Sequence, residues 1–311
     1  MKKHVLGVVA FFALLAMLLV PVSHACSYPL PNDEPVDTLY DINNGRIFVS
    51  LFSANQVLQF GHNCVLERTF GTGSNPGGLS FDGTNLWVAL YGSNAVEKIN
   101  VTTGSEALYS VGVQPRGVAF DGTFIWVTNS GSNTVTKILA SNGFVEGAIN
   151  VGSYPYGVAV NSTNAQTTVW VANRDSASIS IINAQTNVLI ATIGTGSEPQ
   201  FFATNPYADN GIIGLDMWVS CYSSQLVEQF TYQGSLVASY AITGHGQPLG
   251  LSLTSAGVAG ATHSGNVFSI TPNGVSYTPV GSNNYGAVFD VNWNTLWVTD
   301  LNQGTIFEIP F

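Results

Sequence analysis

The chain of 311 residues is apolar and acidic, with 45% hydrophobic, 11% aromatic and only 8% charged residues and a net charge of −10. Its aromatic content and regular apolar pattern exclude a disordered chain, because disordered chains are poor in aromatic residues. The negative charge excludes a protein that holds nucleic acid or anionic lipid through a basic surface.

Residues 1–25 have the pattern of a signal peptide. Lys2 and Lys3 precede an apolar run from Val5 to Val20, and Ser23-His24-Ala25 forms a small-x-small cleavage site. We therefore expect an exported chain of residues 26–311, located in the periplasm, at the cell surface or outside the cell. A lipid anchor on Cys26 is an alternative. It is less favoured because Ser23 stands where lipoprotein signals usually carry an aliphatic residue.

Three cysteines are compatible with one disulfide bond and one remaining thiol in an oxidising compartment. Cys26 and Cys64 are the expected pair. The alternative, that all three are small buried hydrophobic residues, remains open at this point. Cys221 ends an apolar segment, so we expect it to be a free structural thiol.

The main feature of the sequence is a fourteen-residue unit that recurs seven times. In residues 125–138 an apolar strand is followed by a polar turn rich in Asn, Ser and Gly and by a second strand, which is typical of a β-hairpin. The seven copies are residues 47–60, 86–99, 125–138, 169–182, 217–230, 257–270 and 296–309.

A short apolar strand that opens at a turn, often at a proline, precedes each hairpin, and a Gly-containing turn and another strand follow it. Four strands in about forty residues are the period of a propeller blade. The sequence thus predicts an all-β fold, a seven-bladed β-propeller of four-stranded blades, as a single domain over residues 26–311. The last copy ends directly after its third strand, so we expect residues 27–34 to supply the missing strand and close the ring.

One large apolar position recurs in the hairpins. It holds tryptophan in five copies, with Phe48 and Val258 in the other two. Because propeller blades pack face to face, these rings are predicted to be core residues. The five tryptophans are Trp87, Trp126, Trp170, Trp218 and Trp297.

Residues 126–129 (WVTN), 170–173 (WVAN) and 297–300 (WVTD) resemble the Tyr-Val-Thr-Asn repeat of YVTN β-propellers, and residues 151–160 (VGSYPYGVAV) strengthen the match. The chain resembles the wider group of exported YVTN/NHL-like propellers, which includes virginiamycin B lyase, over almost all of residues 26–311. The resemblance implies a propeller. It implies little about activity, because the group ranges from surface and binding proteins to a few enzymes.

In a propeller, the turns that open the first strands and the turns inside the hairpins lie on one face around the central channel. Arginines there, in so acidic a chain, favour a bound carboxylate, phosphate or sulfate group. The alternative is that Arg116 and Arg174 pair with Asp175 or Asp300. We expect Arg116 and Arg174 to point to one sector of the channel mouth with Tyr156 between them. The candidate ligand-binding residues are Arg116, Tyr156, Arg174, Asp175, Gln200, Tyr285 and Asp300.

A second possibility is a metal-assisted lyase or hydrolase. Two histidines and a carboxylate, His245, His263 and Glu198, are a metal-ligand or acid/base set. The resemblance adds that the lyase of the group works with His and Glu around Mg²⁺ on this face. No motif of that lyase aligns beyond the repeat, so no catalytic role is carried over. The alternative requires the three side chains to converge.

The favoured reading is a non-catalytic binding or scaffold module without a cofactor. Its partner would be a protein, a cell-surface polymer, a small anion or another copy of the chain. A surface of amides and hydroxyls can pack against such partners with little desolvation of charge.

Overall fold

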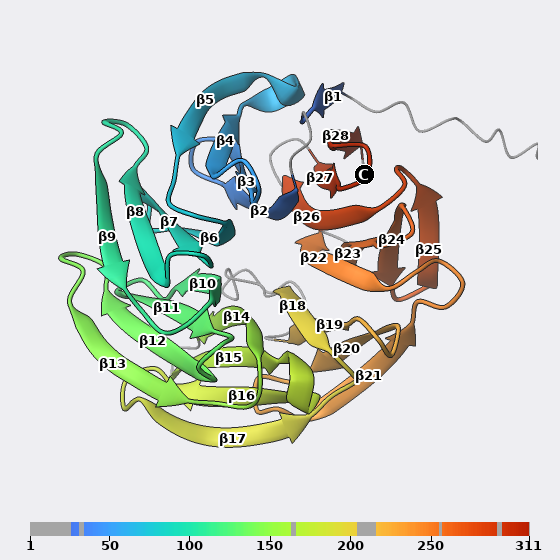
Figure 1. Cartoon of the computed structure of the whole chain (residues 1–311). Helices are drawn as coiled ribbons and strands as arrows, with labels where there is room; N and C mark the ends of the chain where they lie inside the picture. The colour runs from blue at the N-terminus through green and yellow to red at the C-terminus, as the bar shows by residue number, and fades with distance from the viewer. Residues whose placement is uncertain are drawn as a thin grey trace, which may run out of the picture.

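The computed structural model describes residues 26–30, 34–162, 166–203, 216–254, 257–290 and 294–310. The predicted signal peptide lies outside these residues. The described strands form seven antiparallel sheets of four strands each around a central channel, so the predicted seven-bladed propeller is confirmed. In Figure 1 the first strand of every blade faces the centre and the fourth strand faces outward.

Each blade is numbered in chain order and its strands run from the channel outward. Blade 1 holds β2 (Pro35–Asp41), β3 (Arg46–Leu51), β4 (Gln56–Phe60) and β5 (Leu66–Gly71). Blade 2 holds β6 (Pro76–Phe81), β7 (Asn85–Leu90), β8 (Ala95–Asn100) and β9 (Glu106–Ser110). Blade 3 holds β10 (Pro115–Phe120), β11 (Phe124–Asn129), β12 (Thr134–Leu139) and β13 (Val145–Asn150). Blade 4 holds β14 (Pro155–Ser162), β15 (Thr167–Asn173), β16 (Ser178–Asn183) and β17 (Val188–Gly194).

The remaining blades follow the same plan. Blade 5 holds β18 (Pro199–Ala203), β19 (Met217–Cys221), β20 (Leu226–Phe230) and β21 (Leu236–Ala241). Blade 6 holds β22 (Pro248–Thr254), β23 (Gly257–Thr262), β24 (Asn266–Thr271) and β25 (Gly274–Pro279). Blade 7 holds β26 (Asn284–Asp290), β27 (Thr295–Asp300), β28 (Thr305–Pro310) and β1 (Cys26–Pro29). Two 3₁₀ turns, η1 (His62–Cys64) and η2 (Arg174–Ser176), complete the described elements.

The seven hairpins form as predicted, and each turn ends in a residue with a left-handed backbone, which is asparagine or glycine in five of the seven. In blade 3, β11 pairs with β12 with Ile125 opposite Ile138, and the turn residue Asn133 has φ of 55°. Asparagine tolerates this conformation better than most residues. The Asn133 side chain also accepts the backbone N–H of Tyr154 at 2.9 Å and so links blade 3 to blade 4.

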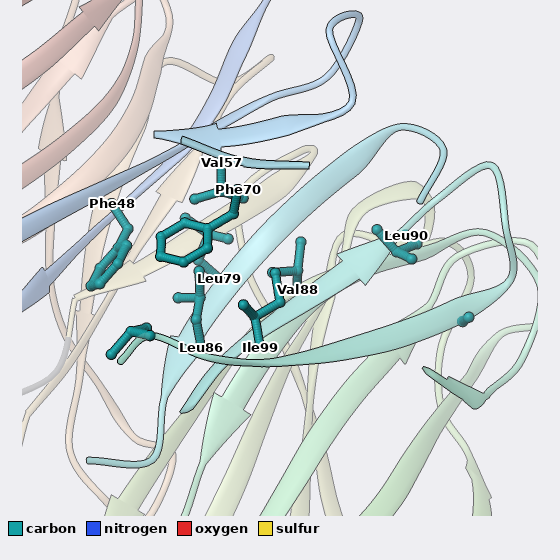
Figure 2. Close-up of a cluster of buried hydrophobic side chains, with 10 residues drawn as sticks. Phe48, Val57, Phe70, Leu79, Leu86, Val88, Leu90 and Ile99 are labelled. Carbon is teal, nitrogen blue, oxygen red and sulfur yellow. The ribbon is translucent and has the colours of Figure 1, made fainter. Parts of the chain in front are cut away.

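The predicted tryptophan column is buried between the blades, and so are Phe48 and Val258. Figure 2 shows the apolar cluster that blades 1 and 2 share, which includes Phe48, Phe70 and Leu79. Three of the indoles also donate a hydrogen bond, Trp170 to the Thr168 hydroxyl at 3.1 Å and the other two to an aspartate. Trp87 Nε1 donates to Asp82 at 2.8 Å, and Trp126 Nε1 donates to Asp121 at 2.7 Å in the next blade.

The N-terminal strand lies where the sequence placed it. β1 pairs with β28, with Tyr28 opposite Ile306 and Pro29 opposite Thr305, and so completes blade 7. Cys64 is buried at the end of η1, and η1 lies against β1, which begins at Cys26. The side chain of Cys26 is outside the described side chains, so the Cys26–Cys64 bond stays a prediction.

Candidate functional site

The first strands of the blades carry Arg116, Tyr156 and Tyr285 near their start. Each opens with a bulge directly after its first residue, for example between Pro115 and Val118, and the bulge re-aims the residues inside it. Arg116, Tyr156 and Tyr285 occupy the same position of this bulge in blades 3, 4 and 7. The same β-bulge therefore recurs in every blade, and the residue at this position varies.

The residue that directly follows this position is glycine in five of the seven blades. It packs against the neighbouring blade so closely that a Cβ on Gly157 would lie 2.0 Å from the carbonyl oxygen of Gln200. In the other two blades this position holds Asp37 and Phe201. Both side chains line the channel cavity of about 200 Å³, together with Arg116 and Tyr156. Two of the seven blades thus place a carboxyl group and an aromatic ring in the cavity, where the other five blades have glycine.

Arg116 is the cation of this cavity. Its guanidinium carbon lies 4.3 Å from the ring centre of Tyr91, 5.2 Å from that of Tyr156 and 6.0 Å from that of Tyr154. Its Nη2 donates to the Tyr154 hydroxyl at 3.1 Å. Arg116 takes part in none of the ion pairs found among the described residues, and its Nε is buried there without a hydrogen-bond partner. Aromatic faces stabilise the charge, but no carboxylate neutralises it.

The pKa values of Arg116 and Tyr154 reflect this contact. Burial lowers the pKa of Arg116, but the phenols of Tyr156 and Tyr154 outweigh it and raise the pKa overall. For Tyr154, burial raises the pKa, and the hydrogen bond and charge of Arg116 reverse the effect and lower it. Arg116 therefore stays charged, and Tyr154 acts as an acceptor toward it.

Arg174 lies on the other side of Tyr154, with its guanidinium carbon 5.4 Å from that ring. The expectation that Tyr156 separates the two arginines is wrong: Tyr154, two residues earlier, contacts both. The alternative, a structural ion pair, holds for Arg174 but with another acid: it pairs with Glu198 at 3.2 Å and not with Asp175 or Asp300. Glu198 also accepts a hydrogen bond from Ser223 at 2.6 Å. Arg174 is therefore neutralised, and Arg116 is the arginine left for a ligand.

Three aromatic rings lie together near Arg116: Tyr156 and Phe201 line the cavity, and Tyr285 contacts both of them from outside the lining. The hydroxyls of Tyr156 and Tyr285 are hydrogen-bonded to each other. The Phe201 ring meets both tyrosines edge to face, with ring centres 5.5 Å and 5.8 Å apart. Burial raises the pKa of both phenols, so they stay protonated donors at neutral pH. This part of the channel offers flat apolar faces with hydroxyls at their edge.

Asp37 is the acid of the cavity. Its carboxylate accepts the backbone N–H of Leu79 from blade 2 at 2.8 Å and its neighbour Thr38 N–H at 2.9 Å. Burial raises the pKa of this carboxyl to about 7, against the smaller opposing effect of these two hydrogen bonds. Asp37 interacts electrostatically with both Tyr156 and Tyr285. A carboxyl group that is half protonated near neutral pH can donate or accept a hydrogen bond.

Three other predicted site residues have different surroundings. Asp300 is fully buried, and its carboxylate accepts the backbone N–H groups of Ser282, Asn302 and Gln303, so it organises the turns of blade 7. Gln200 is buried beside the channel, and Asp175 is exposed on η2. None of these three lines the cavity.

The three residues of the metal-site alternative are not brought together. The His245 ring stacks on Tyr277, with ring centres 3.7 Å apart, whereas His263 meets Tyr222 edge to face at 6.0 Å. Glu198 is paired with Arg174. Within the described ranges, no group of three or more His, Cys, Asp or Glu side chains could hold a metal ion. These residues do not fit the magnesium site that the resemblance implied.

Comparison with known structures supports the architecture. In fold, the chain is similar to virginiamycin B lyase. The Staphylococcus aureus lyase matches with a TM-score of 0.79 and 14% identity over 92% of this chain and 98% of the lyase. A streptogramin B lyase matches with a TM-score of 0.78 and 16% identity over 91% of this chain and 96% of that one. Hydrazine synthase of Kuenenia stuttgartiensis also reaches 0.78, with 14% identity over 91% and 97%.

These likenesses show the fold alone. The matched proteins have different activities, and 1380 chains of solved structures match in all, so the likeness does not select a function. No protein-family model and no curated protein matches the chain in sequence. Within the part of the chain that the structure describes, no helix is able to cross a membrane.

Proposed function

We propose that the chain is a binding module whose channel mouth holds a small carboxylate ligand on Arg116. Arg116 would meet the carboxylate through its guanidinium, with Tyr91 and Tyr154 as walls and Tyr156 beneath. The ligand's remaining atoms would enter the channel toward Phe201.

The observation that carries this proposal is the unbalanced charge of Arg116. Charged side chains removed from water are normally paired, because an isolated buried charge costs several kcal/mol. Lys137 follows this rule in the same protein: it is buried, and it contacts Glu146, the carbonyl of Ala184 and Asn187, each at 3.0 Å. Arg116 has only aromatic partners and one phenol. An anion from outside is the missing partner.

A binding role also agrees with the remaining chemistry of the channel. The propeller supplies a ring of backbone, and the residues that line the cavity include an arginine, a carboxyl group and aromatic residues among aliphatic ones. A lyase or hydrolase that depends on Glu198, His245 and His263 receives no support, because these side chains have separate partners. The predicted signal peptide supports export, which would place this site in the periplasm, at the cell surface or outside the cell. A protein or surface polymer that ends in a carboxylate could present the same group.

The proposal is tested by thermal shift at low ionic strength, because a ligand that binds only the folded state raises the melting temperature. The panel holds small carboxylates, phosphate, sulfate, neutral sugars and divalent cations. We expect carboxylates to raise the melting temperature of the wild type, and neutral sugars and divalent cations to leave it unchanged. Stabilisation by divalent cations alone would contradict the proposal and return attention to a metal site.

A further inference from the structure

We infer that the ligand is a sugar acid, that is, a monosaccharide-sized molecule with one carboxylate and several hydroxyls, and that Asp37, Tyr156 and Tyr285 bind its hydroxyls. This inference rests on the proposed function, because it assigns the carboxylate to Arg116. It adds the rest of the ligand.

The size of the cavity sets the first limit. About 200 Å³ corresponds to roughly six or seven water molecules at about 30 Å³ each. That space suits a single six-membered sugar ring and is far more than an inorganic phosphate or sulfate fills. First-strand residues from all seven blades surround it, so a long polymer could insert only its terminal unit.

The walls of the cavity set the second limit. Tyr156, Phe201 and Tyr285 meet edge to face, so their exposed faces and edges alternate around the channel. The C–H face of a sugar ring packs on an aromatic face, while its hydroxyls need donors and acceptors at the ring edges. The hydrogen-bonded hydroxyls of Tyr156 and Tyr285 lie at such an edge. A hydroxyl group both donates and accepts, so it can join this pair in either direction.

Asp37 sets the third limit. Two backbone N–H groups occupy part of its acceptor capacity, and the rest of the carboxyl faces the cavity. The titratable groups that face it are the phenols of Tyr156 on β14 and Tyr285 on β26, and both phenols also interact with Arg116 of β10. A ligand with an apolar ring would cover these groups and leave their remaining hydrogen-bonding capacity unfilled, whereas a buried polar atom that loses its partner costs about 1–3 kcal/mol. Hydroxyls remove that cost.

Anion binding and the proton on Asp37 are coupled. An ionised Asp37 would repel an anionic ligand in the same cavity, whereas the protonated form donates a hydrogen bond to a ligand hydroxyl. Burial already raises the pKa of Asp37 to about 7. The affinity for a sugar acid should therefore fall as the pH rises from about 6 to about 8, and binding near pH 7 should take up protons.

The test is isothermal titration calorimetry on the protein without its predicted signal peptide, with three ligands of matched size. Glucuronate carries both the carboxylate and the hydroxyls, cyclohexanecarboxylate carries only the carboxylate, and glucose carries only the hydroxyls. We expect glucuronate to bind at least about tenfold more tightly than either of the others, since one hydrogen bond contributes roughly 0.5–1.5 kcal/mol and several are involved.

Two variants and a control locate the effect. At about pH 6, where Asp37 is mostly protonated, Asp37→Asn and Tyr285→Phe should weaken glucuronate binding by roughly tenfold each and leave cyclohexanecarboxylate binding unchanged. Asp37→Asn should also abolish the pH dependence of binding. Glu106→Gln makes the same charge change as Asp37→Asn at an exposed position of β9. It should alter neither the affinity for glucuronate nor the pH dependence of binding. Equal affinity of the wild type for glucuronate and cyclohexanecarboxylate would overturn this inference while leaving the carboxylate site intact. Binding of neither carboxylate would overturn the proposed function itself.

Discussion

Arg116 Nη2 donates a hydrogen bond to the Tyr154 hydroxyl at 3.1 Å, and this neutral phenol is the polar partner found for a partly buried guanidinium. The second arginine at Tyr154, Arg174, is balanced by Glu198. The Tyr154 phenol thus contacts two arginines: Arg174, which Glu198 neutralises, and Arg116, which forms no ion pair with a carboxylate of the described residues.

The first prediction contrasts a partly buried cation, Arg116, with a buried one, Lys137. Arg116→Gln should change the free energy of unfolding by less than about 1 kcal/mol, because the cost of an unbalanced buried charge and the cation–π attraction of the tyrosines both disappear. Lys137→Gln should lower it by roughly 2–4 kcal/mol, because Lys137 holds Glu146 and two neutral acceptors in blades 3 and 4. Urea unfolding of both variants measures this difference. Equal destabilisation by the two changes would mean that Arg116 is also a structural residue.

The second prediction concerns Asp37 and pH. Burial raises the pKa of this group from 3.8 to about 7 in the folded protein, so the folded state binds more protons than the unfolded state between these values. The contribution of Asp37 to stability therefore falls as pH rises from about 4 to about 7. Asp37→Asn keeps an acceptor for Leu79 N–H, and its stability should not fall as the pH rises through this range. We expect the variant to exceed the wild type by roughly 1–3 kcal/mol at pH 8 and to match it at pH 4, as measured by urea unfolding at both values.

The third prediction concerns the rim contact of the blade 2 core. Burial raises the pKa of Asp82, but the hydrogen bonds from Trp87, Asn85 and Thr84 outweigh it and lower the pKa. Its stabilisation is therefore complete above the unfolded value of 3.8 and is lost as pH falls through the lower folded value. Asp82→Ala should lower the free energy of unfolding at pH 7 by roughly 1–3 kcal/mol, and this deficit should shrink below about pH 3.5. Asp175→Ala, at an exposed position, is the control. A deficit that is the same at pH 7 and pH 3 would show that the carboxylate charge is irrelevant.

The fourth prediction concerns the thiols. Cys221 is a buried free thiol, and burial raises its pKa to about 12, so it should not react with iodoacetamide in the folded protein at pH 8. After unfolding without a reductant, mass spectrometry should find one alkylated cysteine, because we expect Cys26 and Cys64 to be bonded. Three alkylated cysteines would show that the predicted bond does not form.

The fold was predictable because the same local signals recur seven times. A strand, a polar turn that ends in a residue such as Asn133, and a second strand define each hairpin without any knowledge of distant contacts. The last blade was predictable by counting, since the seventh copy lacks one strand and the N-terminal segment was unassigned. Seven consistent copies outweigh any single ambiguous one.

The candidate site was predictable only where it follows the repeat. Arg116, Tyr156 and Tyr285 share one position, so the sequence could place them together. Asp37 was missed as a site residue, although it interrupts a column of glycines that an alignment of the seven copies displays.

Tyr154 was missed because it precedes the proline of the turn, where its φ of 51° directs the side chain between two blades. The pairing of Arg174 with Glu198 depends on how neighbouring blades twist, and no local pattern encodes that geometry. The same reason explains why His245 and His263, although both belong to blade 6, contact different tyrosines.

The most direct test of the carboxylate site is the affinity of wild type and Arg116→Gln for small carboxylates, measured by calorimetry at low salt. Arg46→Gln, which removes an arginine paired with Glu67 elsewhere, is the matched control. Charge-assisted hydrogen bonds contribute about 1.5–3 kcal/mol, so Arg116→Gln should weaken binding by roughly 10- to 100-fold and Arg46→Gln should leave it unchanged. Equal affinity of all three proteins, or no carboxylate binding by the wild type, would contradict the assignment of Arg116 as the ligand's partner.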